Sequence, residues 1–260
     1  MVDITLHFFA MTIQLLNHST KSDFTDVFNI CIANTSQLKE EVFRLRYQIY
    51  CEELKYEPLA KFPEKMERDA YDSHSVHCLL KHNPSNCYVG CFRLVLPENP
   101  HKKFPLESFF PDNLMDFAYT SRLQFAEVSR LMVVSEFRNW SLQNEELVNQ
   151  FNNERLQISF PLVTLGLYLS FICLLVEYDI NFGLALMEPK LARHSRHVGI
   201  TSHPIGEHFI NFNGVRRPFL FRTTEILDNF NEKPKIKYLF NLIQATIREN
   251  MSMSHNYFVA

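Results

Sequence analysis

The hydrophobic pattern of the chain alternates between strand-like and helix-like segments. Residues 27–33 alternate in polarity and are rich in β-branched and aromatic types, which predicts a first strand. Thr35 or Ser36 can cap the helix that follows, because a side-chain oxygen there can accept a free backbone N–H. The apolar stripe of this helix consists of Leu38, Val42, Leu45 and Ile49. Arg46 and Tyr50 share another face of it.

Further along, the pattern predicts a long loop and then a hairpin. Residues 55–75 mix prolines with many charges and have no regular period, as functional loops often do. Two β-rich runs, 76–81 and 88–96, are joined by the turn-forming segment 83–86. After an irregular connection, residues 125–134 predict another strand.

The second half of the chain continues this alternation. Polar residues 139–157 fit a helix or a loop, and residues 161–178 predict an apolar helix with Pro161 in its first turn. The remaining predicted elements are a strand at 182–187, a helix at 190–197 opened by Pro189 and ended by Gly199, β-like stretches around Ile200 and at 215–221, and a helical tail at 236–250.

These elements predict an α/β (α+β) fold in which helices flank a mixed central sheet. No repeat and no linker divides the chain, so we expect a single domain over residues 1–260. Its core would span about 27–221, preceded by a lead-in at 1–26 and followed by a helical tail at 222–260.

One segment raises the question of a membrane span. Ile158 to Val176 contains no charge and is long enough to cross a bilayer. It is interrupted by Ser, Thr, Gly and Pro, and its flanks carry mixed charges instead of a basic cluster on one side. We therefore expect a buried core helix, with a membrane span as the alternative and peripheral association left open.

Composition and charge argue against some classes of partner and favour one cellular compartment. The chain has a net charge of -3 and a pI near 6.4, so it lacks the basic field expected of a nucleic-acid-binding protein. Its 24 Phe and 10 Tyr against 6 Gly are compatible with a large apolar pocket. The 6 Cys are scattered in a pattern typical of reduced thiols, and no secretory signal is evident, which favours the cytoplasm.

Charged residues gather in the loop 67–72. Asp69 and Asp72 are flanked there by Glu67 and Arg68, and Arg93 and Arg130 on the neighbouring strands could neutralise them. Spacing alone favours the alternative of a solvated acidic loop.

Strict alternation places Glu127 and Arg130 on opposite faces of their strand, so the two can share a site only if a bulge intervenes. We predict that bulge. Arg93 falls on an otherwise apolar strand face and therefore needs a partner or a path to solvent.

Several segments together resemble a known family. They are Leu45-Arg46 with Tyr50 and Tyr56, the run 67–72 (ERDAYD), the run 90–94 (GCFRL) and the run 127–130 (EVSR). In order and spacing these residues resemble the N-acyl-homoserine lactone (autoinducer) synthases, and they are similar to N-acyl amino acid synthases. Segments 45–53, 187–191 and 213–218 look most like acyltransferases associated with bacterial exosortase (PEP-CTERM) systems.

The resemblance implies a GNAT-type N-acyltransferase fold with a bulged central strand. It also implies an acceptor-side charged cluster consisting of Arg46, Asp69, Asp72, Arg93 and Arg130, with catalytic roles for Glu127 and Arg130. Glu127 matches the glutamate that assists deprotonation of the acceptor amine. The autoinducer synthases have Phe and Trp where this chain has Tyr50 and Tyr56, so the acceptor can differ from S-adenosylmethionine.

The expected reaction moves an acyl group, expected to be a long chain, from a thioester to the amine of a small acceptor such as an amino acid. Residues 135–160 contain no glycine and therefore no loop of the kind that cradles the pyrophosphate of coenzyme A. By resemblance, the donor is an acyl group on an acyl carrier protein, and acyl-CoA stays open. Backbone N–H groups of Leu131 and Met132, freed by the bulge, are candidates to bind the thioester oxygen.

Two other functions and one metal site compete with this reaction. The same fold could form a catalytically silent acyl-carrier or lipid-binding module, or the chain could be a true acyl-homoserine-lactone synthase. Four histidines gather in a short stretch, at His194, His197, His203 and His208. They lack the acidic or thiol partners of a recognisable metal site, so we expect no metal and no permanently bound cofactor.

Overall fold

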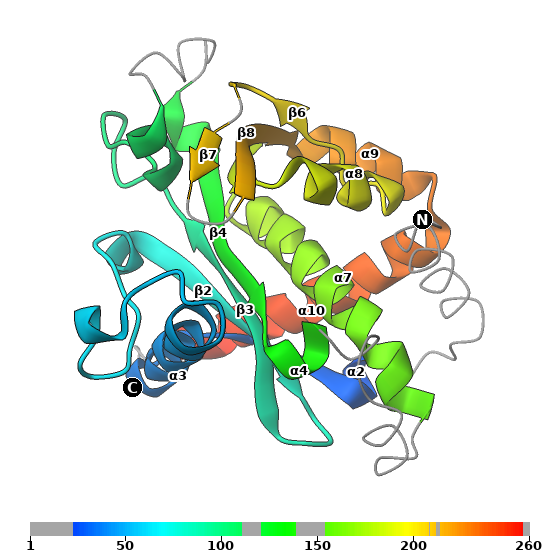
Figure 1. Cartoon of the computed structure of the whole chain (residues 1–260). Helices are drawn as coiled ribbons and strands as arrows, with labels where there is room; N and C mark the ends of the chain where they lie inside the picture. Colours follow the sequence, from blue (N-terminus) through cyan, green and yellow to red (C-terminus); the bar gives the residue numbers. More distant parts are fainter. Residues whose placement is uncertain (1–22, 111–120, 139–153, 208, 212–213, 257–260) are drawn as a thin grey trace, which may run out of the picture.

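A computed structural model describes residues 23–110, 121–138, 154–207, 209–211 and 214–256 (Figure 1). After a short helix, α2 (Asp23–Val27), the chain forms β1 (Phe28–Ile32) and α3 (Ser36–Tyr47). The Thr35 side chain accepts a hydrogen bond from Leu38 N at 3.2 Å, which confirms the predicted cap. The helix then widens into a π-helix over Gln48–Glu53, which the sequence pattern does not indicate.

The hairpin and the central strand follow as expected. The long loop between them and α3 contains only short 3-10 turns at Leu59–Lys61 and Asp72–His74. The hairpin consists of β2 (Ser75–His82) and β3 (Cys87–Val95). Two more 3-10 turns, Pro105–Phe109 and Arg122–Gln124, precede β4 (Phe125–Val133), which ends before the short helix α4 (Ser135–Arg138).

The second half supplies the remaining strands and most of the helical cover. Its elements are α7 (Glu154–Glu177), β5 (Phe182–Met187), α8 (Pro189–His197), β6 (His203–Pro204), β7 (Phe209–Asn211), β8 (Gly214–Arg222), α9 (Thr223–Asn231) and α10 (Pro234–Asn256). The predicted β5 matches its observed bounds, and Gly199 follows α8 with a left-handed φ of 89°.

Two details differ from the sequence predictions, and a third predicted segment lies mostly outside the described residues. The helix α7 begins at Glu154, so Pro161 lies inside it instead of in its first turn. The proline removes one helical hydrogen bond without ending the helix. Ile200 lies outside any strand, because only His203–Pro204 pair with β8 in that region. Of the predicted helix or loop at 139–157, residues 139–153 lie outside the described part of the chain.

The strands form one mixed sheet in the order β1-β2-β3-β4-β5-β8-β6, with β7 paired to β8 (Figure 1). All neighbours are antiparallel except β4 and β5, which run parallel. This parallel pairing is short, from Phe125 opposite Phe182 to Glu127 opposite Leu184. Beyond that point β4 stays paired to β3 while β5 stays paired to β8. The sheet therefore splits between β4 and β5.

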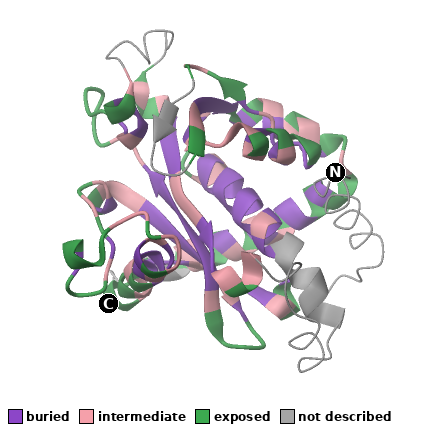
Figure 2. Cartoon of the chain, in the orientation of Figure 1, coloured by how far each residue is buried: buried purple, intermediate pink, exposed green. Residues whose placement is uncertain are grey.

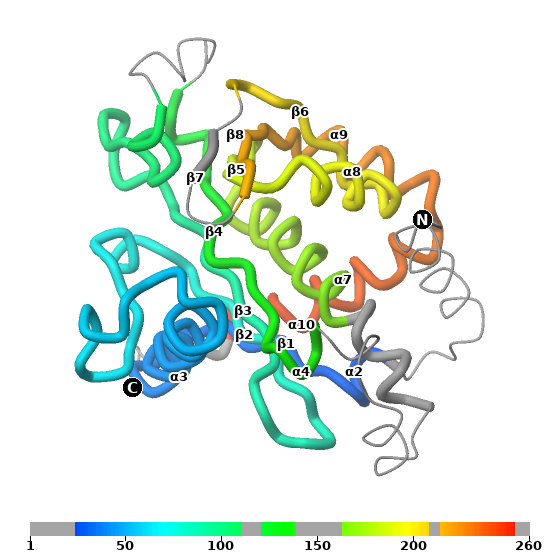
Figure 3. The backbone as a smooth tube through the Cα atoms, viewed as in Figure 1, coloured from blue at the N-terminus to red at the C-terminus, as the bar shows by residue number. Residues whose placement is uncertain are grey.

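Helices cover both faces of the sheet and enclose its core. On β3, Phe92 packs against Phe171 of α7, whereas the next residue, Arg93, meets charged partners held beside α3. The helices α7 and α10 pack against each other (Figures 2 and 3). The close approach of α7 requires Gly90, where a Cβ would lie 2.9 Å from Leu167 Cδ1 and 2.9 Å from Met132 O.

The apolar segment that raised the membrane question is largely interior. Every residue of α7 from Val163 to Leu175 is buried, with the exception of Thr164. Among the described residues, no helix combines the length and the apolar character needed to cross a membrane.

All six cysteines are free, and Cys87 is exposed whereas Cys51, Cys78, Cys91 and Cys173 are buried.

Candidate functional site: a buried charged cluster beside a cavity in the split sheet

Three arginines and three carboxylates form one buried cluster on the α3 side of the sheet. Arg46 comes from α3, Arg93 from β3 and Arg130 from β4, while the carboxylates belong to Glu67, Asp69 and Asp72 of the long loop. Arg46 and Arg93 are 0% and 1% exposed, and Glu67 is 1% exposed. Charges this deep are tolerated only when each has an opposite partner, and here each has one.

Asp72 is the centre of one half of the cluster. Its Oδ1 accepts hydrogen bonds from Arg46 Nη1 and from Arg93 Nη1, each at 2.7 Å, and its Oδ2 accepts one from Asp69 N at 2.7 Å. Burial alone would raise the pKa of Asp72, but Arg46 and Arg93 outweigh it and hold that pKa well below its usual range. Asp72 is therefore charged at neutral pH.

Glu67 is the centre of the other half, whereas the sequence pattern indicates it only as a flank of the two aspartates. It accepts a hydrogen bond from Arg46 Nε and another from Arg130 Nη2 at 2.9 Å. Burial alone would raise the pKa of Glu67, but Arg46 and Arg130 lower it to about 2. Charge balance was the available signal: three inward-facing arginines need a third carboxylate beside Asp69 and Asp72.

Asp69 bridges the two halves and is the most accessible carboxylate of the cluster. Its Oδ1 lies 2.5 Å from Arg93 Nη1 and its Oδ2 lies 3.2 Å from Arg130 Nη2. The Asp69 side chain is 30% exposed, compared with 8% for Asp72. Asp69 can therefore meet an incoming molecule without leaving its arginine partners.

A bulge in β4 brings Arg130 into this cluster. Cys91 pairs with Met132 and Arg93 pairs with Ser129, so Arg130 and Leu131 lie opposite the single residue Phe92. Arg130 has a φ of 54°, in the left-handed region. This confirms the predicted bulge, which allows Arg130 to turn toward Glu67 while its neighbours continue the strand.

The predicted aromatic pair lies over Arg130. The rings of Tyr50 and Tyr56 meet edge to face with centroids 5.8 Å apart, and the Arg130 guanidinium lies 5.1 Å from the Tyr50 ring centroid. The π-helix carries Tyr50 to this position. Arg46, Tyr50, Asp69, Asp72, Arg93 and Arg130 are therefore all brought together as expected, through contacts of the cluster and the ring stack.

Glu127 lies apart from the ion pairs, at the point where β4 and β5 separate. Its Oε2 accepts a hydrogen bond from Leu106 N at 2.9 Å, and the residue is 3% exposed. Burial raises the pKa of Glu127 to about 8, although the Leu106 N–H and the positive charges of Arg93 and Arg130 oppose that rise. Glu127 therefore favours its protonated form at neutral pH, unlike Glu67 and Asp72.

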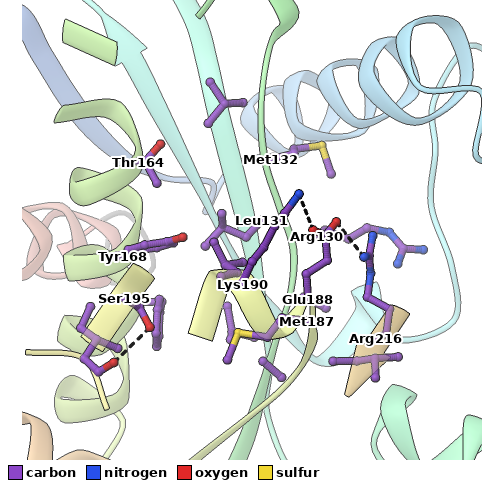
Figure 4. A pocket seen from close by; sticks show the side chains of 18 of the residues that line it. Arg130, Leu131, Met132, Thr164, Tyr168, Met187, Glu188, Lys190, Ser195 and Arg216 are labelled. Carbon is purple, nitrogen blue, oxygen red and sulfur yellow. Dashed lines mark hydrogen bonds and ion pairs between the residues drawn. The ribbon is translucent and has the colours of Figure 1, made fainter. Parts of the chain in front are cut away.

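A cavity of about 400 Å³ occupies the split between β4 and β5. One wall is the β4 segment 128–133, which includes Leu131 and Met132, and the opposite wall is the β5 segment 185–187 with the adjoining Glu188. Figure 4 shows Arg130 on one side of the cavity and Tyr168 of α7 on the other, and Tyr50 and Tyr56 also belong to its lining. Its most deeply buried lining residues include Tyr168, Phe171, Ile200 and Phe221. Arg130 thus belongs to both the charged cluster and the cavity.

The described members of the histidine group are not arranged as metal ligands. No group of three or more His, Cys, Asp or Glu side chains within the described ranges is arranged to hold a metal ion. His203 Nε2 instead lies 2.7 Å from Glu225 Oε2, and His208 lies outside those ranges. A different histidine was missed: His77 is 1% exposed beside Asp72, and burial lowers its pKa to about 4, so it is neutral.

Residues 45–144 match the family described as "Acetyltransferase (GNAT) domain". The fold is GNAT-like. No curated protein sequence matches the chain. The match runs from the last turn of α3 through β4 and α4, and it includes every residue of the charged cluster.

Solved structures of autoinducer synthases share this fold at low sequence identity. TofI, in a ternary complex with an inhibitor and MTA, is 18% identical with a TM-score of 0.56, over 78% of this chain and 96% of TofI. The AHL synthase LasI is 17% identical with a TM-score of 0.52, over 76% and 89%. BjaI, a CoA-dependent acyl-homoserine lactone synthase solved with SAM and isopentyl-CoA, is 19% identical with a TM-score of 0.55, over 86% and 99%.

Proposed function

We propose that this protein is an N-acyltransferase that moves an acyl group from a thioester to the amine of a small acceptor. The observation that carries this proposal is the position of Arg130, which joins a buried charged cluster to an apolar cavity in the split sheet. An acyl thioester needs an apolar slot for its chain, and a charged acceptor needs opposite charges beside the reacting carbon. Both environments meet at this residue.

The cavity is the proposed donor site. Most of its lining residues are apolar, and its volume lies within the usual range for small-molecule sites. Backbone N–H groups at the bulge, near Leu131 and Met132, would stabilise the oxyanion that forms when the thioester carbonyl is attacked. The donor is an acyl group on an acyl carrier protein or on coenzyme A, and the GNAT-like structure of BjaI with isopentyl-CoA favours testing both.

The charged cluster is the proposed acceptor site. Asp69 would attract the ammonium group of the acceptor, and Arg130 would hold an acceptor carboxylate beneath Tyr50 and Tyr56. A zwitterion such as an amino acid satisfies both charges at once. Arg46, Asp72 and Arg93 are more deeply buried than Asp69 and Arg130, and they would hold the side chains of the cluster in position.

The amine must lose a proton to become a nucleophile, and Glu127 is the proposed base. The ammonium group gives one proton to Glu127, directly or through water, and the neutral amine nitrogen then forms a bond to the thioester carbon. The bond to sulfur breaks, and the second proton lost by the nitrogen joins the departing thiolate, which leaves as a free thiol. Glu127 lies at the apex of the split, one residue before the cavity wall begins. Only the deprotonated form of Glu127 can accept this proton, and with a pKa of about 8 that form grows as the pH rises toward and past this value.

Mass spectrometry of lipid extracts tests the proposal even while both substrates are unidentified. Cells that express the chain are compared with cells that express Asp69→Asn, which removes the accessible carboxylate charge and keeps its shape. The proposal expects N-acylated amines that are abundant with the wild type and at least about tenfold lower with the variant. Identical lipid profiles in both strains would contradict it.

A further inference from the structure

Four polar nitrogen atoms on the buried side of the charged cluster have no hydrogen-bond partner among the described residues. They are Nη2 of Arg46, Nη2 of Arg93 and both ring nitrogens of His77. The three residues are 0%, 1% and 1% exposed, so solvent does not reach these atoms. A buried polar group without a partner destabilises the folded state, and such groups are normally satisfied by the protein or by a bound molecule.

The four atoms lie around one carboxylate oxygen, Asp72 Oδ1. Arg46 Nη1 and Arg93 Nη1 each donate to this oxygen at 2.7 Å, and each Nη2 lies beside its Nη1 in the same rigid guanidinium plane. His77 Nε2 lies 3.8 Å from the same oxygen, which is too far for a hydrogen bond. The carboxylate therefore brings the four nitrogens together without satisfying them.

Two further contacts place His77 next to both arginines. His77 of β2 and Arg93 of β3 are directly opposite each other, so their side chains project from the same face of the sheet. The Phe43 ring of α3 has its centroid 5.6 Å from that of the His77 ring and 5.5 Å from Arg46 Cζ. The imidazole and the two guanidinium groups therefore lie side by side in the buried layer beside α3.

The charge balance of the cluster decides what kind of molecule can satisfy them. Its three arginines are matched by three carboxylates, and burial lowers the pKa of His77 to about 4, so the imidazole adds no charge at neutral pH. An ion would leave an uncompensated charge in a region closed to solvent. Each Nη2 can only donate, whereas a neutral imidazole has one N–H and one accepting nitrogen. The molecule must therefore be small, neutral and able both to accept and to donate.

We propose that a buried water molecule joins His77 to the free Nη2 groups of Arg46 and Arg93, and that His77 is thereby a positioning residue of the cluster. The water oxygen accepts from both Nη2 groups, and one water hydrogen is donated to the ring nitrogen that carries no proton. Buried waters commonly make about three such bonds to groups that would otherwise be unsatisfied. The inference goes beyond the proposed function, because the bridge forms whether or not the chain transfers an acyl group.

Crystal structures of the purified full chain and of two His77 variants test the bridge, at a resolution that shows ordered water. The wild type should show an electron-density peak within about 3.2 Å of one His77 ring nitrogen and of Nη2 of both arginines. His77→Gln keeps a side chain that can accept and donate, and it should retain the peak. His77→Leu removes the accepting atom and should lose the peak. The urea midpoint of unfolding should fall further in His77→Leu than in His77→Gln, because only the leucine leaves the bridge broken.

The matched control is His82→Leu. His82 lies on the same strand and is 3% exposed, but its Nδ1 is 2.8 Å from Ser85 Oγ. Removing this other buried imidazole should leave the peak in place.

Several results would overturn the inference. A wild type in which the His77 ring bonds Asp72 directly, with no peak between His77 and the arginines, would contradict the water. An anomalous signal at the peak in bromide-soaked crystals would identify an anion site instead. A peak that persists in His77→Leu, or equal urea midpoints for the two variants, would contradict the positioning role. The wild-type structure decides the presence of water even if a variant does not fold, and absence of turnover would contradict the proposed function alone.

Discussion

At the scale of single residues, the cluster is held together by charges that cannot be removed one at a time. Arg46 is fully buried and bonds both Glu67 and Asp72. Removing one member leaves a carboxylate buried without compensation, which costs far more than the ion pair contributes by itself. The same geometry that orders the acceptor site thus makes it sensitive to substitution.

Arg46→Met should therefore lower the free energy of unfolding by about 3–5 kcal/mol. Urea unfolding of the purified variant measures this change. Arg44→Ala is the matched control, because Arg44 pairs with Glu40 and Glu41 on the exposed side of the same helix and should change stability by at most about 1 kcal/mol. Equal effects at the two positions would show that the cluster is not buried as described.

Glu127 should give the reaction a pH dependence of its own. Because its pKa is about 8, the basic form grows as pH rises through that value, and the rate at low substrate should rise with it. Glu127→Gln should lower kcat/KM by about 100-fold or more and abolish this rise. A pH–rate profile of both proteins checks it, and undiminished turnover in Glu127→Gln would exclude Glu127 as the base.

The same pKa has a consequence for stability with a definite sign. Folding raises the pKa of Glu127 from 4.5 to about 8, so between these values the folded state binds more protons than the unfolded chain. Stability from this group is complete at low pH and is lost as pH rises from about 4.5 to about 8. Thermal unfolding midpoints should therefore fall less steeply with pH in Glu127→Gln than in the wild type.

At the scale of elements, the bulge in β4 is the feature that brings the two halves of the site together. It turns Arg130 toward Glu67 at a φ of 54°, a conformation that β-branched residues strongly disfavour. Arg130→Gly and Arg130→Val remove the same charge, so their difference reports the backbone alone. Arg130→Val should be less stable than Arg130→Gly by about 1–2 kcal/mol in urea unfolding, and the reverse order would contradict a bulge at this residue.

Most elements could be predicted from sequence because their periodicity is local. The cap at Thr35, the hairpin, β5 and the bulge all follow from residues close together in the chain. The π-helix over Gln48–Glu53 could not, because a helix that widens keeps nearly the same apolar spacing. Charge balance required a third inward carboxylate, but the irregular pattern of the long loop does not indicate which one turns inward, so Glu67 was missed.

The functional site, like the fold, could be predicted from the sequence only in part. Arg93 on an apolar strand face indicated a buried partner, and Asp69 and Asp72 are those partners. The cavity could not be predicted, because it depends on where β4 and β5 separate, and this is set by pairing between residues far apart in sequence. Tyr168 lies in an apolar helix whose spacing is equally typical of packing, and only the cavity shows which face of it is free.

At the scale of the whole molecule, the sheet is two paired blocks joined by a short parallel contact. β1 to β4 form one block with the charged cluster, and β5 with β8 forms the other. The cavity lies between the blocks, with α7 closing one side. Substrates that enter from opposite ends of this gap would meet near Arg130, which is the geometry that acyl transfer requires.

A larger side chain in the cavity between β4 and β5 should change which acyl donors are used without preventing folding. Ala185 of β5 lines the cavity, and Ala185→Phe would occupy much of its width. Long acyl donors should lose about tenfold or more in kcat/KM, while short ones such as acetyl retain most of their activity. Ala60→Phe, on an exposed turn, is the control for the added ring. Equal losses for long and short donors would place the acyl chain elsewhere.

The most direct test of the acyl-transfer account is amine-dependent thiol release by the purified protein. Acyl-CoA and acyl carrier protein donors are each incubated with a panel of amino acids and with S-adenosylmethionine, and free thiol is followed over time. The account predicts that some donor and amine together release thiol in one-to-one ratio with an N-acyl product, and that neither substrate does so alone. Thiol release that is absent, or that proceeds at the same rate without any amine, would contradict it.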